Sequence, residues 1–160
     1  MAARNSTDFD RDPRMIIATR VFDAPRSLVF EAWTHQKHLA QWWGPDGFST
    51  TTRSMDIRSG GVWRFVMHGP DGRDYENRIT YVEVVKPKRL VYRHGGGDDV
   101  EPVEFEVEVT FEEIGEQTQL TMRMVFPSAE ERARVIKEYG ADKGLVQTLA
   151  RLSEYVKSMR

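Results

Sequence analysis

His35 and His38, three positions apart, are the residues of this sequence most typical of a metal site. Residues at this spacing lie on one face of a helix, and zinc sites often take two imidazoles from such a face. The chain has no cysteine to complete the site, and the nearby Glu31 is of a type usually found in solvent. We therefore predict no metal and no cofactor, with both histidines exposed.

Motifs for hydrolysis or phosphate binding are not evident either. Serines, carboxylates and four histidines leave a hydrolytic triad open by counting, but no Gly-x-Ser-x-Gly element is present. A glycine run at residues 95–97 precedes acidic residues and a strand pattern, so it lacks the helix N-terminus that cradles phosphate. Residues 98–101 are expected to form a hydrated acidic loop. These observations predict no catalytic residue.

Composition indicates one globular domain, with its own core, over residues 14–160, after a disordered polar extension over residues 1–13. The 23 basic and 25 acidic side chains nearly cancel to a net charge of −2. Nucleic acid is therefore an unfavourable partner, because no excess of positive charge gathers phosphates. The sequence has neither an apolar run long enough to span a membrane nor a secretory signal, so we expect a cytoplasmic protein.

The elements that must position any site begin with a strand followed by helices. The β-rich run from Met15 to Phe22 predicts the first strand, and Pro25 suits the first turn of a helix. A second short helix ends at Gly44-Pro45, which cannot continue a helix. Three tryptophans here either wall a pocket mouth or pin the two helices to the sheet; we favour pinning for Trp33, Trp42 and Trp43.

Beyond Phe48 the apolar residues recur with a period of two, which is typical of half-buried strands. In the clearest case the acidic residues alternate with apolar ones and must face solvent, namely Glu104, Glu106 and Glu108. Turns rich in glycine separate the runs at residues 59–61, 70–72, 95–98 and 114–116. The pattern predicts an α+β fold whose antiparallel sheet has six to seven strands in a meander.

The C-terminal third of the sequence predicts helices. Ser128 and Glu131 form a capping box, and Gly140 interrupts or ends the helix that follows. A last helix is expected from about residue 142 to 158, with its polar face, including Arg151, available for solvent. Its apolar face must lie on the sheet and comprises Leu145, Leu149, Leu152 and Val156.

One helix is too narrow for so wide a sheet. A helix of about 16 residues is roughly 24 Å long and about 10 Å across, so the sheet must curl around it or dimerise through an uncovered face. Curling leaves space that apolar side chains line and that a few polar tips complete. The predicted ligand-binding residues are Trp63, Phe65, Met67, Tyr75, Asn77, Tyr92, Phe105, Val107, Met122, Met124, Leu145, Thr148, Leu149 and Leu152. From these residues alone, a closely packed core remains an equal alternative.

Several runs of the sequence, in order, resemble one known family. They are RVFDAP (20–25), VFEAWT (29–34), LAQWWGP (39–45), DIRSGGVWR (56–64), GPDG (69–72), PKRL (87–90), VTF (109–111) and LARL (152 as its last residue). This order is similar to that of the bacterial branch of the family named after the activator of heat-shock-protein-90 ATPase, in the SRPBCC superfamily of START-like proteins. The resemblance extends over nearly the whole chain, from about residue 16 to 156.

This resemblance implies a helix-grip fold, in which the curved sheet wraps around the long C-terminal helix and two short helices follow the first strand. The superfamily's shared feature is a cavity for hydrophobic or amphipathic small molecules, and some of its members are cyclases. Our leading hypothesis is therefore a protein, monomer or homodimer, that binds an apolar or aromatic small molecule without changing it. Two alternatives remain open. The first is a cavity-based enzyme whose inward acid or base candidates are His94, Tyr75 and Glu83. The second is a chaperone-interacting domain that uses the outer face of the sheet.

Overall fold

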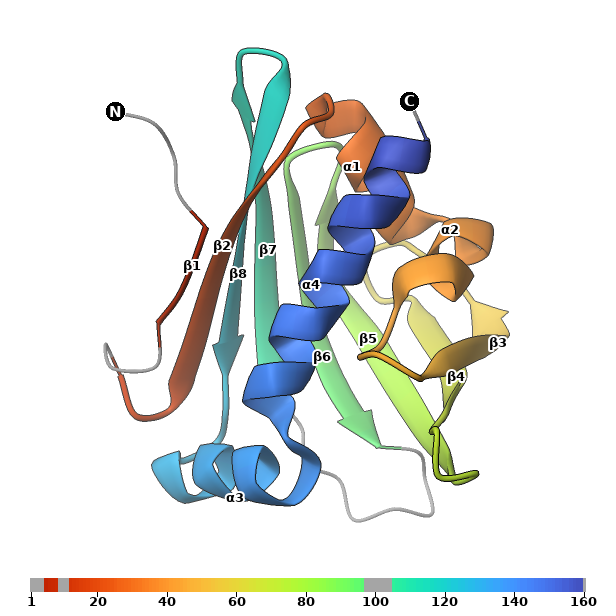
Figure 1. Ribbon diagram of the computed structural model, residues 1–160, viewed down its shortest axis with the longest axis vertical. Helices are drawn as coiled ribbons and strands as arrows, with labels where there is room; N and C mark the ends of the chain where they lie inside the picture. Colours follow the sequence, from red (N-terminus) through yellow and green to blue (C-terminus); the bar gives the residue numbers. More distant parts are fainter. Residues whose placement is uncertain (1–4, 9–11, 97–104, 160) are drawn as a thin grey trace.

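The computed structural model describes residues 5–8, 12–96 and 105–159 of the chain (Figure 1). Its strands are β1 (Ser6–Asp8), β2 (Met15–Phe22), β3 (Ser49–Met55), β4 (Val62–His68), β5 (Asp74–Val85), β6 (Arg89–Gly96), β7 (Phe105–Ile114) and β8 (Gln117–Val125). Its helices are α1 (Arg26–Thr34), α2 (Gln36–Trp42), α3 (Ala129–Tyr139) and α4 (Ala141–Ser158). The acidic loop predicted at residues 98–101 and the outward Glu104 lie outside the described residues.

All the strands join one antiparallel sheet in the order β1-β2-β8-β7-β6-β5-β4-β3. The described part of the chain thus gives eight strands, one more than the largest number predicted. The additional strand is β1, which pairs with β2 through Thr7 and Ala18. It lies in the polar N-terminal stretch, whose three-residue strand has no apolar periodicity to reveal it.

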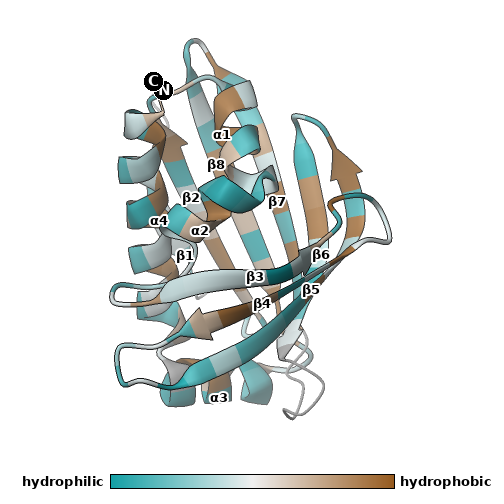
Figure 2. Ribbon diagram, turned by 90° about the vertical axis from the view of Figure 1, so that its right-hand side faces the viewer, coloured by the Kyte–Doolittle hydropathy of each residue, from teal (hydrophilic) through white to brown (hydrophobic). Residues whose placement is uncertain are grey.

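The sheet is strongly curved, as predicted. In Figure 2 the strands β3, β4 and β5 run across the direction of β7 and β8. Two irregularities in strand register, between Thr52 and Ser54 and between Tyr81 and Glu83, lie in the part that turns. Because a bulge bends its strand and increases the local twist, both help to close the sheet around the helix.

Helix α4 lies along the concave face of the sheet (Figure 1), which confirms the predicted helix-grip fold. Its apolar stripe is buried as the spacing predicted, and consists of Leu145, Leu149, Leu152 and Val156. The predicted capping box also forms, because the backbone N–H of Glu131 donates to Oγ of Ser128 at 3.1 Å. Gly140 separates α3 from α4 with φ +61°, a left-handed conformation that favours glycine.

Helices α1 and α2 follow β2 and cover the remaining end of the concave face, where α2 contacts both β3 and α4. The indole Nε1–H of Trp42 donates to the carbonyl oxygen of Ala32 at 3.0 Å and so joins the two helices. The short helices and α4 together form a single layer over the sheet.

Among the helices that the structure describes, none is long and apolar enough to cross a membrane.

Candidate functional site

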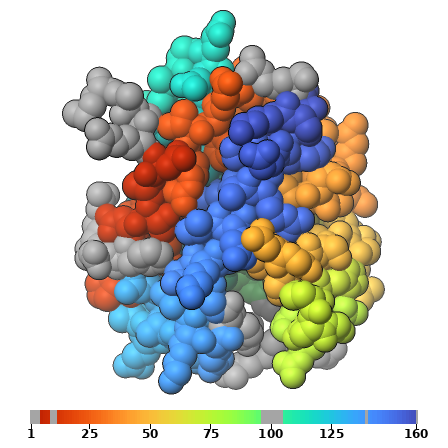
Figure 3. Space-filling model, in the orientation of Figure 1, coloured from red at the N-terminus to blue at the C-terminus, as the bar shows by residue number. Residues whose placement is uncertain are grey.

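A cavity of about 130 Å³ lies between α4 and the inner face of the sheet. In Figure 3 a hollow is visible between the blue surface of α3 and α4 and the yellow-green surface of the β4–β5 hairpin. The walls come from α1, α2, the segment after α2, four strands and α4. They comprise Trp33, Trp42, Trp43, Gly44, Pro45, Met67, Tyr92, His94, Phe105, Met122, Met124, Ala141, Leu145, Thr148 and Leu149.

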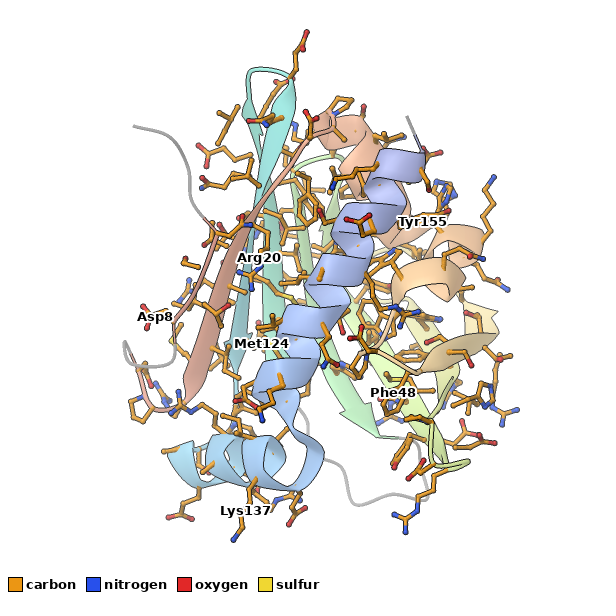
Figure 4. All side chains as sticks on the ribbon, in the orientation of Figure 1. Asp8, Arg20, Phe48, Met124, Lys137 and Tyr155 are labelled. Carbon is orange, nitrogen blue, oxygen red and sulfur yellow. The ribbon has the colours of Figure 1, made fainter. Side chains whose placement is uncertain are left out.

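The structure brings together eight of the fourteen residues that the sequence predicts as ligand-binding. They alternate along strands or recur along α4, which is why period counting could find them. Met124, labelled in Figure 4, lies on β8 beside α4. The eight are Met67, Tyr92, Phe105, Met122, Met124, Leu145, Thr148 and Leu149.

Four other predicted residues are buried but lie behind the cavity wall. Trp63 and Phe65 stack on each other with ring centroids 3.9 Å apart, and Trp43 packs edge-on against both. Val107 and Leu152 are fully buried in the core. Trp43 thus stands between the cavity and the aromatic pair of β4. For this reason Trp63 and Phe65 lie on the predicted inner face of the sheet without lining the cavity.

The last two predicted residues, Tyr75 and Asn77, do not line the cavity. The ring of Tyr75 packs near Phe48 with centroids 6.0 Å apart, outside the cavity wall. Asn77 lies beside His94, where its Oδ1 is 2.9 Å from Nε2 of the imidazole. Asn77 therefore affects the cavity only through its hydrogen bond to His94.

His94 is a cavity residue whose protonation state is set by its surroundings. The amide of Asn77 donates to the carbonyl oxygen of Tyr75 at 2.9 Å, which directs Oδ1 towards His94. Since Oδ1 only accepts, Nε2 of His94 carries the proton and Nδ1 keeps a lone pair. Burial beside Trp43, Phe65 and other rings lowers the pKa of His94 to about 4, so the ring is neutral at neutral pH.

Two polar atoms of the cavity walls have no hydrogen-bond partner within the described part of the chain. They are Nε1 of Trp33 and the hydroxyl oxygen of Tyr92, and their side chains are 3% and 2% exposed. Buried polar groups are normally hydrogen-bonded, and leaving one without a partner costs about 1–3 kcal/mol. Both atoms have almost no accessible surface, so they lie within the packed wall, and the surface that faces the cavity is almost entirely apolar.

The tryptophans were predicted to pin the short helices rather than to wall a pocket. They pack together as expected, with ring centroids of Trp33 4.9 Å from Trp42 and 5.8 Å from Trp43. All three also line the cavity, so this interpretation was incomplete. His94 was predicted as an inward acid or base candidate and not as a ligand-binding residue; it lines the cavity, because it shares the inward face of β6 with Tyr92 two positions earlier.

Arg151 is half-buried and hydrogen-bonded beside the cavity, whereas the sequence predicted that its side chain is available for solvent. Its guanidinium donates to the carbonyl oxygens of Gly44 at 2.7 Å, Pro45 at 3.0 Å and Phe48 at 3.2 Å. These contacts join α4 to the segment after α2, which includes the cavity residues Gly44 and Pro45. The sequence pattern could not reveal them because the acceptors are backbone atoms about a hundred positions away.

The prediction that both candidate metal-site histidines are exposed was wrong for His38. His35 lies between α1 and α2 and is exposed, whereas His38 is only 8% exposed. Nδ1 of His38 lies 2.5 Å from the hydroxyl of Tyr155, labelled in Figure 4 on α4. The two rings remain neighbours, with centroids 5.8 Å apart in an edge-on arrangement, and burial of His38 lowers its pKa. Among the described residues, no group of three or more possible ligands is placed to hold a metal.

A hydrogen-bonded series with the order of a hydrolytic triad lies on the opposite face of the sheet. Nε2 of His68 is 2.8 Å from Oγ1 of Thr51, and Nδ1 is 2.7 Å from Oδ1 of Asp74. Thr51 and Asp74 are exposed, and none of the three residues lines the cavity. Without walls that exclude water or bind a substrate, this arrangement is typical of cross-strand pairing on a solvated surface.

A larger depression of about 550 Å³ lies beside α1, between that helix and the residues Ile57, Val84 and Lys86. Its wall is mixed and includes the charged Glu31 and Lys86. None of the unpartnered buried atoms in the described chain belongs to its lining. The smaller cavity under α4 is therefore the better candidate site, since its apolar walls and few polar groups are typical of small-molecule sites.

Comparison with known proteins agrees with this architecture. A family model described as "Activator of Hsp90 ATPase homolog 1-like protein" matches residues 23–157 of the chain. No curated protein matches it.

Several solved structures share the fold. One is a protein from Arthrobacter aurescens, with 23% identity, a TM-score of 0.89, and 96% of this chain and 91% of that chain covered. A protein from Mycobacterium smegmatis has 24% identity, a TM-score of 0.86, and coverages of 97% and 98%. An AHSA1 protein from Silicibacter pomeroyi has 21% identity, a TM-score of 0.75, and coverages of 91% and 99%. At these identities the likeness concerns the fold alone.

Proposed function

Because the chain belongs to the family of Activator of Hsp90 ATPase homolog 1-like proteins, we propose that it uses their shared fold to bind a hydrophobic or aromatic small molecule in the cavity under α4. The observation that carries this proposal is the wall itself. Aromatic rings and methionines surround a space between sheet and helix, and methionine adapts its shape to a ligand. A cavity of this composition favours holding an apolar molecule over reacting with it.

The enzyme alternative has lost two of its three acid or base candidates. Glu83 forms an ion pair with Arg89 at 3.2 Å, and neither Glu83 nor Tyr75 lines the cavity. His94 does, but a base whose pKa is lowered to about 4 has little driving force for taking a proton at neutral pH. Binding without turnover is the function that this chemistry supports better.

The chaperone alternative rests on the family's name and on the outer face of the sheet. There the carboxylate of Glu108 pairs with Arg89 at 2.7 Å and with Arg123 at 3.6 Å. These charges are already compensated within the chain, so they offer little net charge to a partner. The cytoplasmic location and the choice between monomer and homodimer stay predictions.

Titration with ethylbenzene, followed by two-dimensional amide NMR, tests the proposal. We expect saturable shifts of residues around the cavity in the wild-type protein. The variant Leu145→Trp places an indole inside the cavity and should abolish these shifts, because Leu145 belongs to the wall. The matched control Val146→Trp adds the same ring on the next residue of α4, where the side chain is 44% exposed, and should preserve them.

Two results would remove the proposal. One is the absence of saturable shifts in the wild type up to the solubility of ethylbenzene. The other is an equal response in Leu145→Trp and Val146→Trp with both proteins folded, because binding would then lie elsewhere. Native mass spectrometry of protein purified from its own host would in addition report the mass of any natural ligand that it retains.

A further inference from the structure

One ring nitrogen of the cavity histidine is left for a ligand. His94 lines the cavity, and its Nε2–H donates to Asn77, while Nδ1 has a lone pair and no hydrogen-bond partner among the described residues. We propose that the cavity selects an uncharged phenol, an aromatic ring with a hydroxyl group, whose O–H donates to Nδ1 of His94. This inference rests on the proposed binding function and adds the class of ligand.

Nδ1 of His94 differs from the unpartnered atoms of Trp33 and Tyr92 because it keeps accessible surface. Those two atoms are closed off by their neighbours, and Nδ1 does not belong to that group. His94 is half-buried, with the rings of Phe105 and Phe65 packed near it at centroid distances of 5.0 Å and 5.9 Å. Since His94 also belongs to the cavity wall, a ligand in the cavity lies within reach of this nitrogen.

This nitrogen can only accept a hydrogen bond at neutral pH. The amide of Asn77 donates to the carbonyl oxygen of Tyr75, so its Oδ1 faces His94 and fixes the proton on Nε2. Burial lowers the pKa of His94 to about 4, which keeps Nδ1 unprotonated. A phenolic hydroxyl, as in tyrosine, has a pKa of about 10 and keeps its own proton. The contact is therefore a hydrogen bond between neutral groups, without proton transfer.

The other polar groups of the wall also suit a hydroxyl. Oγ1 of Thr148 donates to the carbonyl oxygen of Gly144 at 2.7 Å, so towards a ligand it can only accept. The indole N–H of Trp43 has no partner among the described residues, and its ring lies beside that of His94 with centroids 6.3 Å apart. A hydroxyl both donates and accepts, whereas a carbonyl or ether oxygen would leave Nδ1 of His94 without a donor.

The wall disfavours a charged ligand by its composition. The described residues that line it include no Asp, Glu, Lys or Arg, and His94 is neutral. The guanidinium of Arg151, beside the cavity, is committed to the carbonyl oxygens of Gly44, Pro45 and Phe48. A charged group placed in the cavity would lose its hydration without gaining a counter-ion, which is strongly unfavourable. The donor to Nδ1 is therefore a neutral hydroxyl and not an ammonium group.

The volume limits the ligand to about one ring. An apolar cavity of about 150 Å³ in a protein core is known to take up benzene. The cavity here is about 130 Å³, so a single ring with small substituents matches it. The flexible side chains of Met67, Met122 and Met124 can move to admit the substituents.

Calorimetric titration with three uncharged probes of nearly equal size tests this class. Para-cresol has a hydroxyl group that donates, anisole holds its oxygen in an ether that can only accept, and para-xylene has a methyl group in place of the hydroxyl. One net hydrogen bond to His94 predicts that para-cresol binds about fivefold tighter than anisole. Para-xylene reports binding by the apolar part of the wall alone.

Matched variants assign the preference to His94. His94→Phe keeps an aromatic ring in the wall but removes Nδ1, so the preference for para-cresol over anisole should vanish while the affinity for para-xylene changes by less than about twofold. His68→Phe is the control, because it makes the same substitution at a histidine that does not line the cavity. It should leave the affinities of all three probes unchanged.

The ring nitrogens of the wild-type protein give a second measurement that needs no substitution and decides the matter if His94→Phe does not fold. In long-range proton–nitrogen NMR spectra, the signal of Nδ1 of His94 should move upfield and saturate as para-cresol is added, because its lone pair acquires a donor. Para-xylene should move this signal far less. The signals of His68, outside the cavity, should respond to neither probe.

The outcomes separate this inference from the function on which it rests. Equal affinities for para-cresol and anisole, a preference that survives in His94→Phe, or an Nδ1 signal that responds equally to para-cresol and para-xylene would each overturn the inferred ligand class while leaving a cavity that binds apolar molecules. Failure of all three probes to bind the wild-type protein would instead overturn the proposed function itself.

Discussion

Nε2 of His94 lies 2.9 Å from Oδ1 of Asn77, and this contact determines which nitrogen of a cavity histidine carries the proton. The imidazole is neutral because aromatic rings surround it and desolvate its charged form. A neutral, fixed ring contributes to the wall without adding charge to it. The protonation state of His94 therefore affects both the polarity of the cavity wall and the stability of the fold.

Stability should depend on pH through His94. The pKa of His94 is lowered to about 4 in the folded protein, against about 6.5 for an unfolded chain. Between these values the unfolded state binds more protons, so the free energy of unfolding should fall as pH decreases from 6.5 to 4, by about 1–3 kcal/mol. Urea unfolding at several pH values measures this change.

The variant His94→Gln serves as the reference, because other groups titrate in the same range. Burial also lowers the pKa of His38, which adds a fall of the same sign in both proteins. The difference between the two proteins isolates His94 and should shrink as pH falls through this window. A difference that is independent of pH would show that His94 protonates as easily in the folded state as in the unfolded one.

Removing the hydroxyl of Tyr92 should stabilise the ligand-free protein. Tyr92→Phe eliminates a buried group with no partner among the described residues, and we expect a gain of about 1 kcal/mol in the free energy of unfolding. Tyr81→Phe, at a buried tyrosine outside the cavity, should give no gain. Denaturant unfolding of both variants tests this, and a loss of stability in Tyr92→Phe would mean that the hydroxyl has a partner in solution.

The Arg151 contacts should control how fast ligands leave. Arg151→Met keeps much of the aliphatic stem but removes the donors that hold the segment of Gly44 and Pro45 against α4. We expect a loss of about 1–2 kcal/mol in stability. We also expect faster dissociation of ethylbenzene, measured by NMR exchange. Lys157→Met, on an exposed position of the same helix, is the control and should change neither quantity. Unchanged dissociation in Arg151→Met would show that this edge is not the exit.

Gly44 is required at the cavity edge for two reasons that can be separated. Its φ is +109°, and an added Cβ would lie 3.1 Å from Cε of Met67 and 3.2 Å from Cβ of Phe48. Gly60 has φ +86° but open space around it, so Gly60→Ala measures the backbone term alone. Gly44→Ala should cost about 1–3 kcal/mol, and more than Gly60→Ala. Equal losses in thermal unfolding would mean that Met67 and Phe48 move aside without cost.

Much of the fold could be predicted because its determinants are local. Alternation along β7 and β8 and the spacing of Leu145, Leu149 and Leu152 follow directly from strand and helix geometry. Strand β1 was missed because it consists of three polar residues held by pairing with β2. Such an edge strand depends on its neighbour and leaves no apolar period in the sequence.

The residues that line the cavity could be predicted only in part, because strand and helix periods do not show which inward side chains reach the open space. Trp63 and Phe65 share the inward face of β4 with Met67, yet Trp43 covers them and leaves only Met67 in the wall. Which of several inward residues meets the space depends on long-range packing of the segment after α2. Strand and helix periods identify the side chains on the inner face, and tertiary contacts determine which of these side chains line the cavity.

The indole N–H signal of Trp33 provides the most direct measurement of ligand binding in the cavity. On titration with ethylbenzene we predict that this proton NMR signal moves and saturates, because Trp33 belongs to the cavity wall that a bound aromatic ring would contact. The indole of Trp63 already donates to Oγ1 of Thr52 at 3.0 Å, and its signal should move far less. No saturable movement of the Trp33 signal, or the same movement in Leu145→Trp, would contradict the existence of a ligand site under α4.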